Sequence, residues 1–105
     1  DIGGGMEGYS SDITRMAALR EPPAGYHEIH AVVEAAVQAA MAAARPGVAA
    51  RVVDDAARGV ITEAGYGEYF VHRTGHGMGV EIHEQPYLTS VSETVLEAGM
   101  VFSIE

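Results

Sequence analysis

IHAVVEAAVQAAMAAA, residues 29–44, repeats apolar side chains at intervals of three and four residues. That spacing places the apolar side chains along one face of a helix. A pair of prolines precedes the pattern, and Pro46 with Gly47 ends it. We therefore predict a helix over residues 25–45, and helix propensity alone explains its many alanines.

A second apolar series with the same spacing follows and predicts a second helix over residues 49–65. Around the two helices the pattern changes to alternating and short apolar runs, which are typical of strands. These runs cover residues 7–16, 68–72, 79–83 and 100–104. Helices grouped between strands favour an α+β fold, with an antiparallel sheet and helices on one face, over an alternating βαβ fold.

The composition limits the class of protein and its partners. A chain of 105 residues with 48% apolar and 20% charged residues is typical of one globular domain. Its net charge of −9 disfavours nucleic acid and anionic membrane as partners, because both need clustered Lys and Arg, whereas it suits divalent cations. No apolar run approaches the roughly 18 residues that span a bilayer. The absence of cysteine excludes thiolate metal sites and fits a reducing compartment, so we expect a cytoplasmic protein.

Two aspartates, Asp1 and Asp12, flank the glycine-containing run IGGGMEGYSS. Glycine favours the positive backbone angles of a hairpin turn, and the two strands of a hairpin would bring these carboxylates side by side. Adjacent buried carboxylates need a shared proton or a cation. The alternative is that Asp1 is a frayed chain terminus and Asp12 an ordinary turn or edge-strand residue.

Three histidines and two glutamates lie within HRTGHGMGVEIHE, residues 72–84. Gly77 and Gly79, which lie between His76 and His83, would allow a ligand to approach closely. Metal or substrate binding by the two histidines therefore competes with ordinary hydrogen-bonded burial as an explanation. Imidazole ligands are normally oriented by a hydrogen bond on their other nitrogen. The candidates for such orienting residues are His72, Arg73 and Glu84.

Glu105 directly follows the apolar run MVFSI. A carboxylate at the end of a buried strand needs a partner, which would make Glu105 a ligand. The alternative is a solvated chain end.

Taken in order, DIGGGMEGYSSDITR, HRTGHGMGVEIHE and LEAGMVFSIE resemble three successive active-site blocks of the pita-bread metallopeptidases. This family contains Xaa-Pro aminopeptidases, prolidases and methionine aminopeptidases. The run SDITR after the second aspartate resembles the branch that cleaves Xaa-Pro bonds. The resemblance implies a pita-bread (creatinase/aminopeptidase-like) fold, of which residues 1–105 would be a partial catalytic domain that lacks the strands before Asp1 and after Glu105.

The resemblance also implies a site with two divalent metal ions, of Mn, Co, Fe or Zn. Their ligands would be Asp1, Asp12, His76 and Glu105, with Asp12 bridging the two ions. A hydroxide held between the ions would attack the Xaa-Pro peptide bond. His83 would hydrogen-bond the substrate or the tetrahedral intermediate, and Glu105 would help to pass the proton to the leaving nitrogen.

Two residues that the family usually has are without a counterpart in residues 1–105: a fifth, bridging glutamate ligand and a substrate-contacting histidine. We therefore expect the 105-residue chain by itself to be weak or inactive, and the intact protein to be an aminopeptidase or dipeptidase for peptides with proline after the first residue. A homodimer is left open for the intact protein. The alternatives are a non-catalytic pita-bread binding module, although every ligand position that the chain reaches is filled, and a methionine aminopeptidase-type enzyme.

Overall fold

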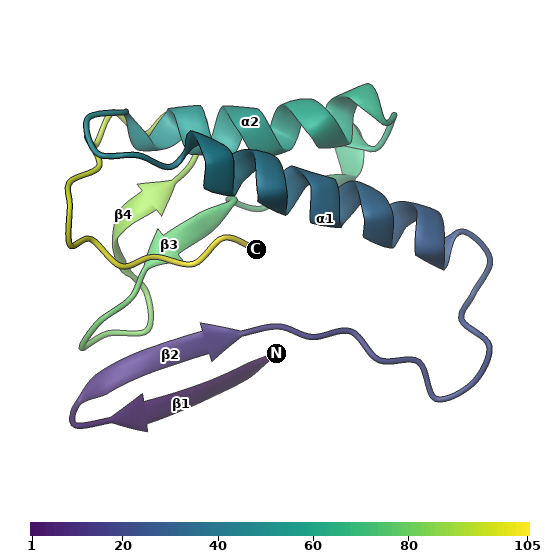
Figure 1. The fold of residues 1–105 in the computed structure, drawn as a ribbon, viewed down its shortest axis with the longest axis horizontal. Coiled ribbons are helices and arrows are strands. Elements are labelled where there is room, and N and C mark those ends of the chain that lie inside the picture. Colours follow the sequence, from purple (N-terminus) through teal and green to yellow (C-terminus); the bar gives the residue numbers. More distant parts are fainter.

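The two predicted helices form one layer of the molecule (Figure 1). In the computed structural model, which describes residues 1–105, α1 runs over Tyr26–Ala43 and α2 over Ala50–Glu63. Both helical predictions are confirmed to within two residues. Gly25, in the left-handed conformation with φ of 82°, caps the start of α1, a backbone angle that residues with a Cβ rarely adopt.

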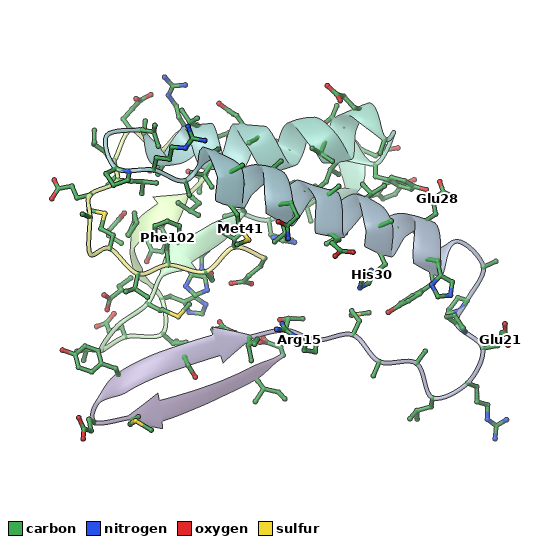
Figure 2. The ribbon with its side chains drawn as sticks, viewed as in Figure 1. Arg15, Glu21, Glu28, His30, Met41 and Phe102 are labelled. Carbon is green, nitrogen blue, oxygen red and sulfur yellow. The ribbon has the colours of Figure 1, made fainter.

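The helices pack against each other through small side chains, which let their backbones approach closely. The buried apolar core is formed by Ala36, Ala40, Ala50, Val53, Ala57, Leu88 and Leu96. Figure 2 shows Met41 projecting from the side of α1 that faces the C-terminal segment with Phe102. Phe102 is partly buried against the core, so this segment is held beneath the helical layer.

The N-terminal residues form the predicted hairpin. Strand β1, Ile2–Met6, pairs antiparallel with β2, Tyr9–Ile13. Glu7 and Gly8 make the turn with φ of 52° and 88°. The prediction of a strand over residues 7–16 is therefore confirmed only for its central part. The hairpin lies apart from the helices in Figure 1, on the far side of the second pair of strands.

The second pair consists of β3, Gly75–Gly77, and β4, Glu84–Leu88, which are antiparallel and lie under α2. The C-terminal segment runs beside β3 in the antiparallel sense. Its backbone amides at Ser103 and Glu105 donate to the carbonyls of His76 and Thr74, each at 2.8 Å. The segment predicted as a strand over residues 100–104 therefore lies beside β3 and bonds to it. It is not a continuous strand, because only Phe102 forms a β-bridge, with Gly77.

The prediction of a strand over residues 68–72 is wrong. The chain forms a short 3₁₀ helix, η1, over Gly67–Tyr69 and then continues without regular structure. The carbonyls of Phe70 and His72 accept hydrogen bonds from the Arg58 side chain, at 2.8 and 3.0 Å. A side chain thus satisfies the acceptors that a neighbouring strand would otherwise have used.

The prediction of a strand over residues 79–83 is also wrong, because this segment bends back on itself. The Gly79 amide donates to the Glu81 carbonyl at 3.0 Å, and the Glu81 amide donates to the Glu84 carboxylate at 3.2 Å. The strand begins only at Glu84.

The α+β class and the antiparallel pairing are confirmed, but the strands form two separate two-stranded sheets. The Ser10 amide links the sheets by donating to the Gly79 carbonyl at 2.7 Å. Neither helix is long and apolar enough to cross a bilayer.

Candidate metal centre

Three predicted ligands, Asp12, His76 and Glu105, meet at one point although they come from three separate segments. Nε2 of His76 lies 2.9 Å from Oε1 of Glu105 and 3.6 Å from Oδ2 of Asp12. The three candidate ligand atoms all lie within 4.8 Å of one another. The His76 side chain is 3% exposed, that of Asp12 13% and that of Glu105 41%, so the cluster is buried on the His76 side and open to solvent at Glu105.

The hairpin register explains how Asp12 reaches this point. Asp12 on β2 lies directly opposite Gly3 on β1, so the two residues face the same side of the hairpin. Because glycine has no side chain, this pair presents only the Asp12 carboxylate on that side. The hydrogen bond from Ser10 to Gly79 holds β2 against the segment that follows β3. Asp12 is thereby brought to His76 from a distant part of the sequence.

The imidazole of His76 is oriented by the backbone. Its Nδ1–H donates to the carbonyl of Gly77 at 3.0 Å, because a carbonyl oxygen can only accept. Nε2 is then left to face the two carboxylates. Metal-binding histidines normally have this arrangement, in which a hydrogen bond fixes one ring nitrogen and the other nitrogen faces the metal.

Ser103 is a site residue that the sequence reasoning missed. Its hydroxyl donates to Oε1 of Glu105 at 2.6 Å and accepts from the His76 amide at 3.2 Å. It therefore connects two members of the cluster and holds the Glu105 carboxylate. The signal was available in the sequence, since side chains two residues apart in an extended segment lie on the same side.

His83 lies at the edge of the cluster, with its ring centroid 4.3 Å from that of His76. Both rings border an open pocket whose lining contains no hydrophobic residue. The lining residues are His72, Arg73, Gly75, His76, His83, Thr89 and Glu105. The exposed imidazole of His83 is therefore available to a molecule that enters this pocket.

Asp1 lies outside the cluster. Its side chain is exposed, and its Oδ1 accepts a hydrogen bond from the Thr14 hydroxyl at 3.4 Å. Continuing the register of the hairpin by one pair places Asp1 opposite Thr14, on the same face as Asp12. The two predicted aspartates thus share a face of the hairpin, but only Asp12 contacts His76.

The three residues predicted to orient the ligands bind elsewhere. Nδ1 of His72 contacts the Arg73 carbonyl at 2.7 Å, the Arg73 guanidinium lies 4.9 Å from the centre of the Tyr87 ring, and Glu84 accepts from the Glu81 amide. No hydrogen bond or ion pair joins these three side chains to Asp12, His76 or Glu105. His72 and Arg73 do line the polar pocket beside the cluster.

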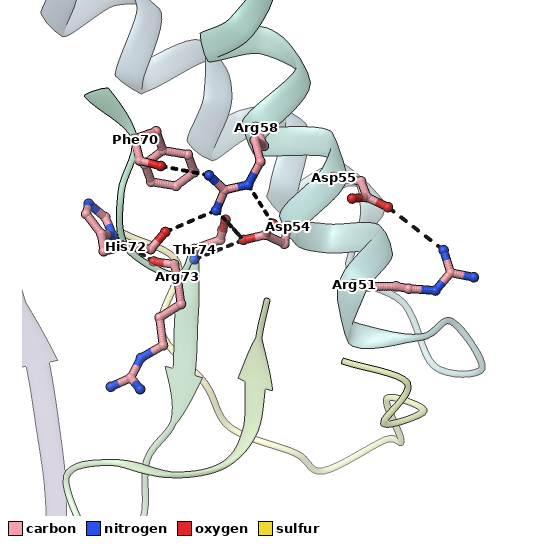
Figure 3. A network of polar contacts seen from close by, with 8 residues as sticks. All are labelled: Arg51, Asp54, Asp55, Arg58, Phe70, His72, Arg73 and Thr74. Atoms are coloured by element: carbon pink, nitrogen blue, oxygen red, sulfur yellow. Dashed lines mark hydrogen bonds and ion pairs between the residues drawn. The ribbon is translucent and has the colours of Figure 1, made fainter. Parts of the chain in front are cut away.

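An ion pair on α2, between Arg58 and the buried Asp54, also escaped the sequence reasoning (Figure 3). Asp54 on α2 is fully buried and accepts hydrogen bonds from Arg58 and Thr74. Burial opposes its charged form, but the hydrogen bonds and the positive charge of Arg58 outweigh that effect and hold the pKa of Asp54 below its usual 3.8. In the sequence, Asp54 and Arg58 look like an ordinary pair on an exposed helix face.

The donor chemistry of the cluster fits a divalent cation. Two carboxylates and one imidazole nitrogen that point at one another repel unless a proton or a cation lies between them. Oxygen donors with a single imidazole suit Mn(II), Co(II), Fe(II) or Zn(II). The geometry and donor atoms of Asp12, His76 and Glu105 therefore fit a divalent metal ion.

Comparison with known proteins agrees with this chemistry. A curated Xaa-Pro dipeptidase from Lactobacillus delbrueckii subsp. lactis is 51% identical over 105 residues, which are 100% of this chain and 28% of that protein. Dipeptidase PepE from Mycobacterium ulcerans superposes with a TM-score of 0.95 and 50% identity, over 99% of this chain and 28% of that one. Prolidase from Pyrococcus furiosus superposes with a TM-score of 0.93 and 45% identity, over 97% and 30%.

The chain thus spans less than a third of the length of these relatives. Its elements superpose on those of prolidases, which have the pita-bread fold. The sequence profile of metallopeptidase family M24 matches every residue from 1 to 105. This chain therefore belongs to metallopeptidase family M24.

Proposed function

We propose that the full-length protein containing this chain is an exopeptidase that hydrolyses Xaa-Pro peptides with two divalent metal ions. The observation that carries the proposal is the convergence of Asp12, His76 and Glu105, with all three ligand atoms within 4.8 Å, in a chain of family M24. A structural histidine would need one carboxylate partner at most. Two carboxylates at one imidazole nitrogen are better explained by a cation.

Asp12, His76 and Glu105 would hold one ion, and Asp1 with Asp12 would hold the other. The common face of the two aspartates on the hairpin supports this division. When bound, the ions would supply a hydroxide nucleophile between them at neutral pH and would polarise the scissile carbonyl. We infer that residues 1–105 are part of a catalytic domain whose remainder supplies a fifth carboxylate, in keeping with the greater length of the relatives.

Two residues of the chain would act on the substrate directly. His83 borders the open polar pocket beside His76, where its imidazole would hydrogen-bond the substrate carbonyl or the tetrahedral intermediate. Glu105, held by the Ser103 hydroxyl at 2.6 Å, would carry the proton to the leaving nitrogen. The Ser103 bond keeps this carboxylate from rotating away from His76.

The substrate class is supported by the relatives. The Lactobacillus relative is an Xaa-Pro dipeptidase, the Pyrococcus furiosus one a prolidase and the Mycobacterium ulcerans one a dipeptidase. We propose dipeptides or short peptides with proline in the second position as substrates. Peptides with amino-terminal methionine are the comparison class that would identify a methionine aminopeptidase instead.

The test is to purify the full-length protein, remove metal with a chelator and restore activity with Mn(II) or Co(II), using Xaa-Pro dipeptides, longer Xaa-Pro peptides and Met-peptides. We expect activity on the Xaa-Pro series to be lost on chelation and regained with metal, and to be abolished in His76→Ala. Asp12→Asn should also lose activity, and Asp55→Asn is its matched control, because Asp55 is exposed and its one ion pair is with Arg51, at 3.9 Å. Full activity after exhaustive chelation would refute metal catalysis, and a preference for Met-peptides would refute the substrate class.

A further inference from the structure

The ion pair between buried Asp54 and partly exposed Arg58 connects α2 to the segment that leads into β3 (Figure 3). Nε and Nη2 of Arg58 donate to the two carboxylate oxygens of Asp54 at 2.9 and 3.1 Å. The same guanidinium donates to the carbonyls of Phe70 and His72. Arg58 thus holds a carboxylate on its own helix and the backbone of a distant segment at the same time.

Asp54 extends this connection to Thr74. Its Oδ1 accepts from the Thr74 hydroxyl at 2.7 Å and from the Thr74 amide at 3.2 Å. Asp54 and Thr74 are both 0% exposed, so water cannot replace either bond. Four hydrogen bonds therefore run from Asp54 and Arg58 to residues 70–74.

Thr74 is the point from which two ligands of the cluster are placed. His76 lies two residues further along, on the same side of the extended chain. The Thr74 carbonyl accepts the amide of Glu105 at 2.8 Å, and so sets the position of the C-terminal segment along β3. A shift of Thr74 would move His76 and Glu105 together relative to Asp12, which is carried by the separate hairpin.

We propose that Asp54, Arg58 and Thr74 form an anchor that sets the position of His76 and Glu105, and thereby the affinity of the site for divalent metal. Their side chains make no hydrogen bond or ion pair with the side chains of Asp12, His76 or Glu105, and Thr74 meets Glu105 only through the backbone, so they are positioning residues. An ion pair within one helix that only stabilised that helix would not need to bond the backbone of the segment that leads to a ligand-bearing strand. This inference rests on the proposed metal-dependent function.

The test compares two substitutions at Thr74 in the full-length protein. Thr74→Val keeps the shape of the side chain but removes the hydroxyl donor to Asp54, whereas Thr74→Ser keeps the donor. After removal of metal, each variant is titrated with Mn(II) by calorimetry. We expect Thr74→Val to weaken Mn(II) binding about 10-fold or more, the range found when a group that orients a ligand is lost, and Thr74→Ser to restore most of it.

The control for a merely structural role is Val53→Ala, because Val53 is fully buried on the same helix but has no polar contact with the anchor. It should lower the free energy of unfolding while leaving the Mn(II) affinity unchanged. Asp54→Asn provides a second variant, which should bind Mn(II) more weakly than the wild type. The anchor is refuted if Thr74→Val and Asp54→Asn bind Mn(II) like the wild type, or if Val53→Ala weakens binding equally. A wild-type protein that binds no Mn(II) would instead refute the proposed function.

Discussion

At the scale of single residues, the site depends on how hydrogen bonds limit each side chain. The Gly77 carbonyl holds the His76 ring, and Ser103 holds Glu105. His83 has no such bond and lies at the border of the open pocket. His76 and Glu105, which would bind metal, are therefore held in place, while His83, which would meet the substrate, is free to adjust to it.

His83→Ala should lower the turnover of Xaa-Pro dipeptides by the full-length protein without releasing metal. Loss of one donor to the developing oxyanion costs about 100- to 1000-fold in kcat. Steady-state kinetics with parallel measurement of bound Mn(II) would check this. His30→Ala, a change at an exposed histidine on α1, serves as the control. Loss of metal from His83→Ala would contradict the assignment and make His83 a ligand.

Asp54→Ala should destabilise the full-length protein by about 3 kcal/mol, the lower end of the range for a broken buried ion pair, because Arg58 is partly exposed. The lowered pKa of Asp54 means that its carboxylate stabilises the native state above its usual pKa of 3.8, which it has in the unfolded chain. That contribution is lost as the pH falls through the lower, native pKa. Urea unfolding from pH 7 to pH 2.5 should therefore show the wild type and Asp54→Ala converging in acid. A constant difference in the free energy of unfolding across this range would contradict the ion pair.

At the scale of elements, β3 is crowded from both sides. The C-terminal segment pairs with one edge and β4 with the other. A Cβ at Gly75 would overlap the Ser103 carbonyl, and one at Gly77 would overlap the backbone at Gln85. The two glycines are therefore needed to bring three extended segments together around His76.

Gly75→Ala should destabilise the full-length protein by about 3 kcal/mol or more, because the carbonyl that it meets is backbone and cannot rotate away. Gly59→Ala on α2 is the matched control, since nothing lies within 4 Å of its added Cβ. That change should stabilise the protein by about 0.5–1 kcal/mol through helix propensity. Thermal and urea unfolding of the two variants would measure the difference. Equal stabilities would show that β3 can move away from the C-terminal segment.

At the scale of the whole molecule, the cluster joins parts that have few other contacts. Asp12 lies on the hairpin, His76 on β3 and Glu105 at the end of the chain, and Figure 1 shows the hairpin separate from the helical layer. An ion bound by all three would connect the hairpin to the body of the protein. The net charge of −9 would also raise the local concentration of divalent cations.

Metal should therefore stabilise the native state of the full-length protein, because the unfolded chain does not bring the three ligands together. At a free metal concentration 100 times the Kd, the stabilisation is about 2.7 kcal/mol. Thermal unfolding at increasing Mn(II) should show a rising Tm in the wild type and a constant Tm in His76→Ala. A wild-type Tm that does not depend on Mn(II) would contradict a native-state metal site.

Most of the elements could be predicted because their information is local. The apolar spacing of residues 29–44 is enough to specify an amphipathic helix, and the glycines around Glu7 and Gly8 are enough to specify a hairpin. The strand predictions over residues 68–72 and 79–83 are wrong because a side chain outside each segment takes up backbone hydrogen bonds within it. Arg58 takes the backbone acceptors of the first segment, and Glu84 folds the second into a bend.

The sequence by itself determined the α+β class, the two helices, the hairpin and the identity of the candidate ligands, because these depend on periodicity and on residue types in order. Only the tertiary structure decided which ligands meet and what holds them. Asp12, His76 and Glu105 converge while Asp1 stays outside, and Ser103 and the Asp54–Arg58 pair support the cluster. Such contacts join residues far apart in the chain, and their partners are chosen by packing and by the need to satisfy buried polar groups.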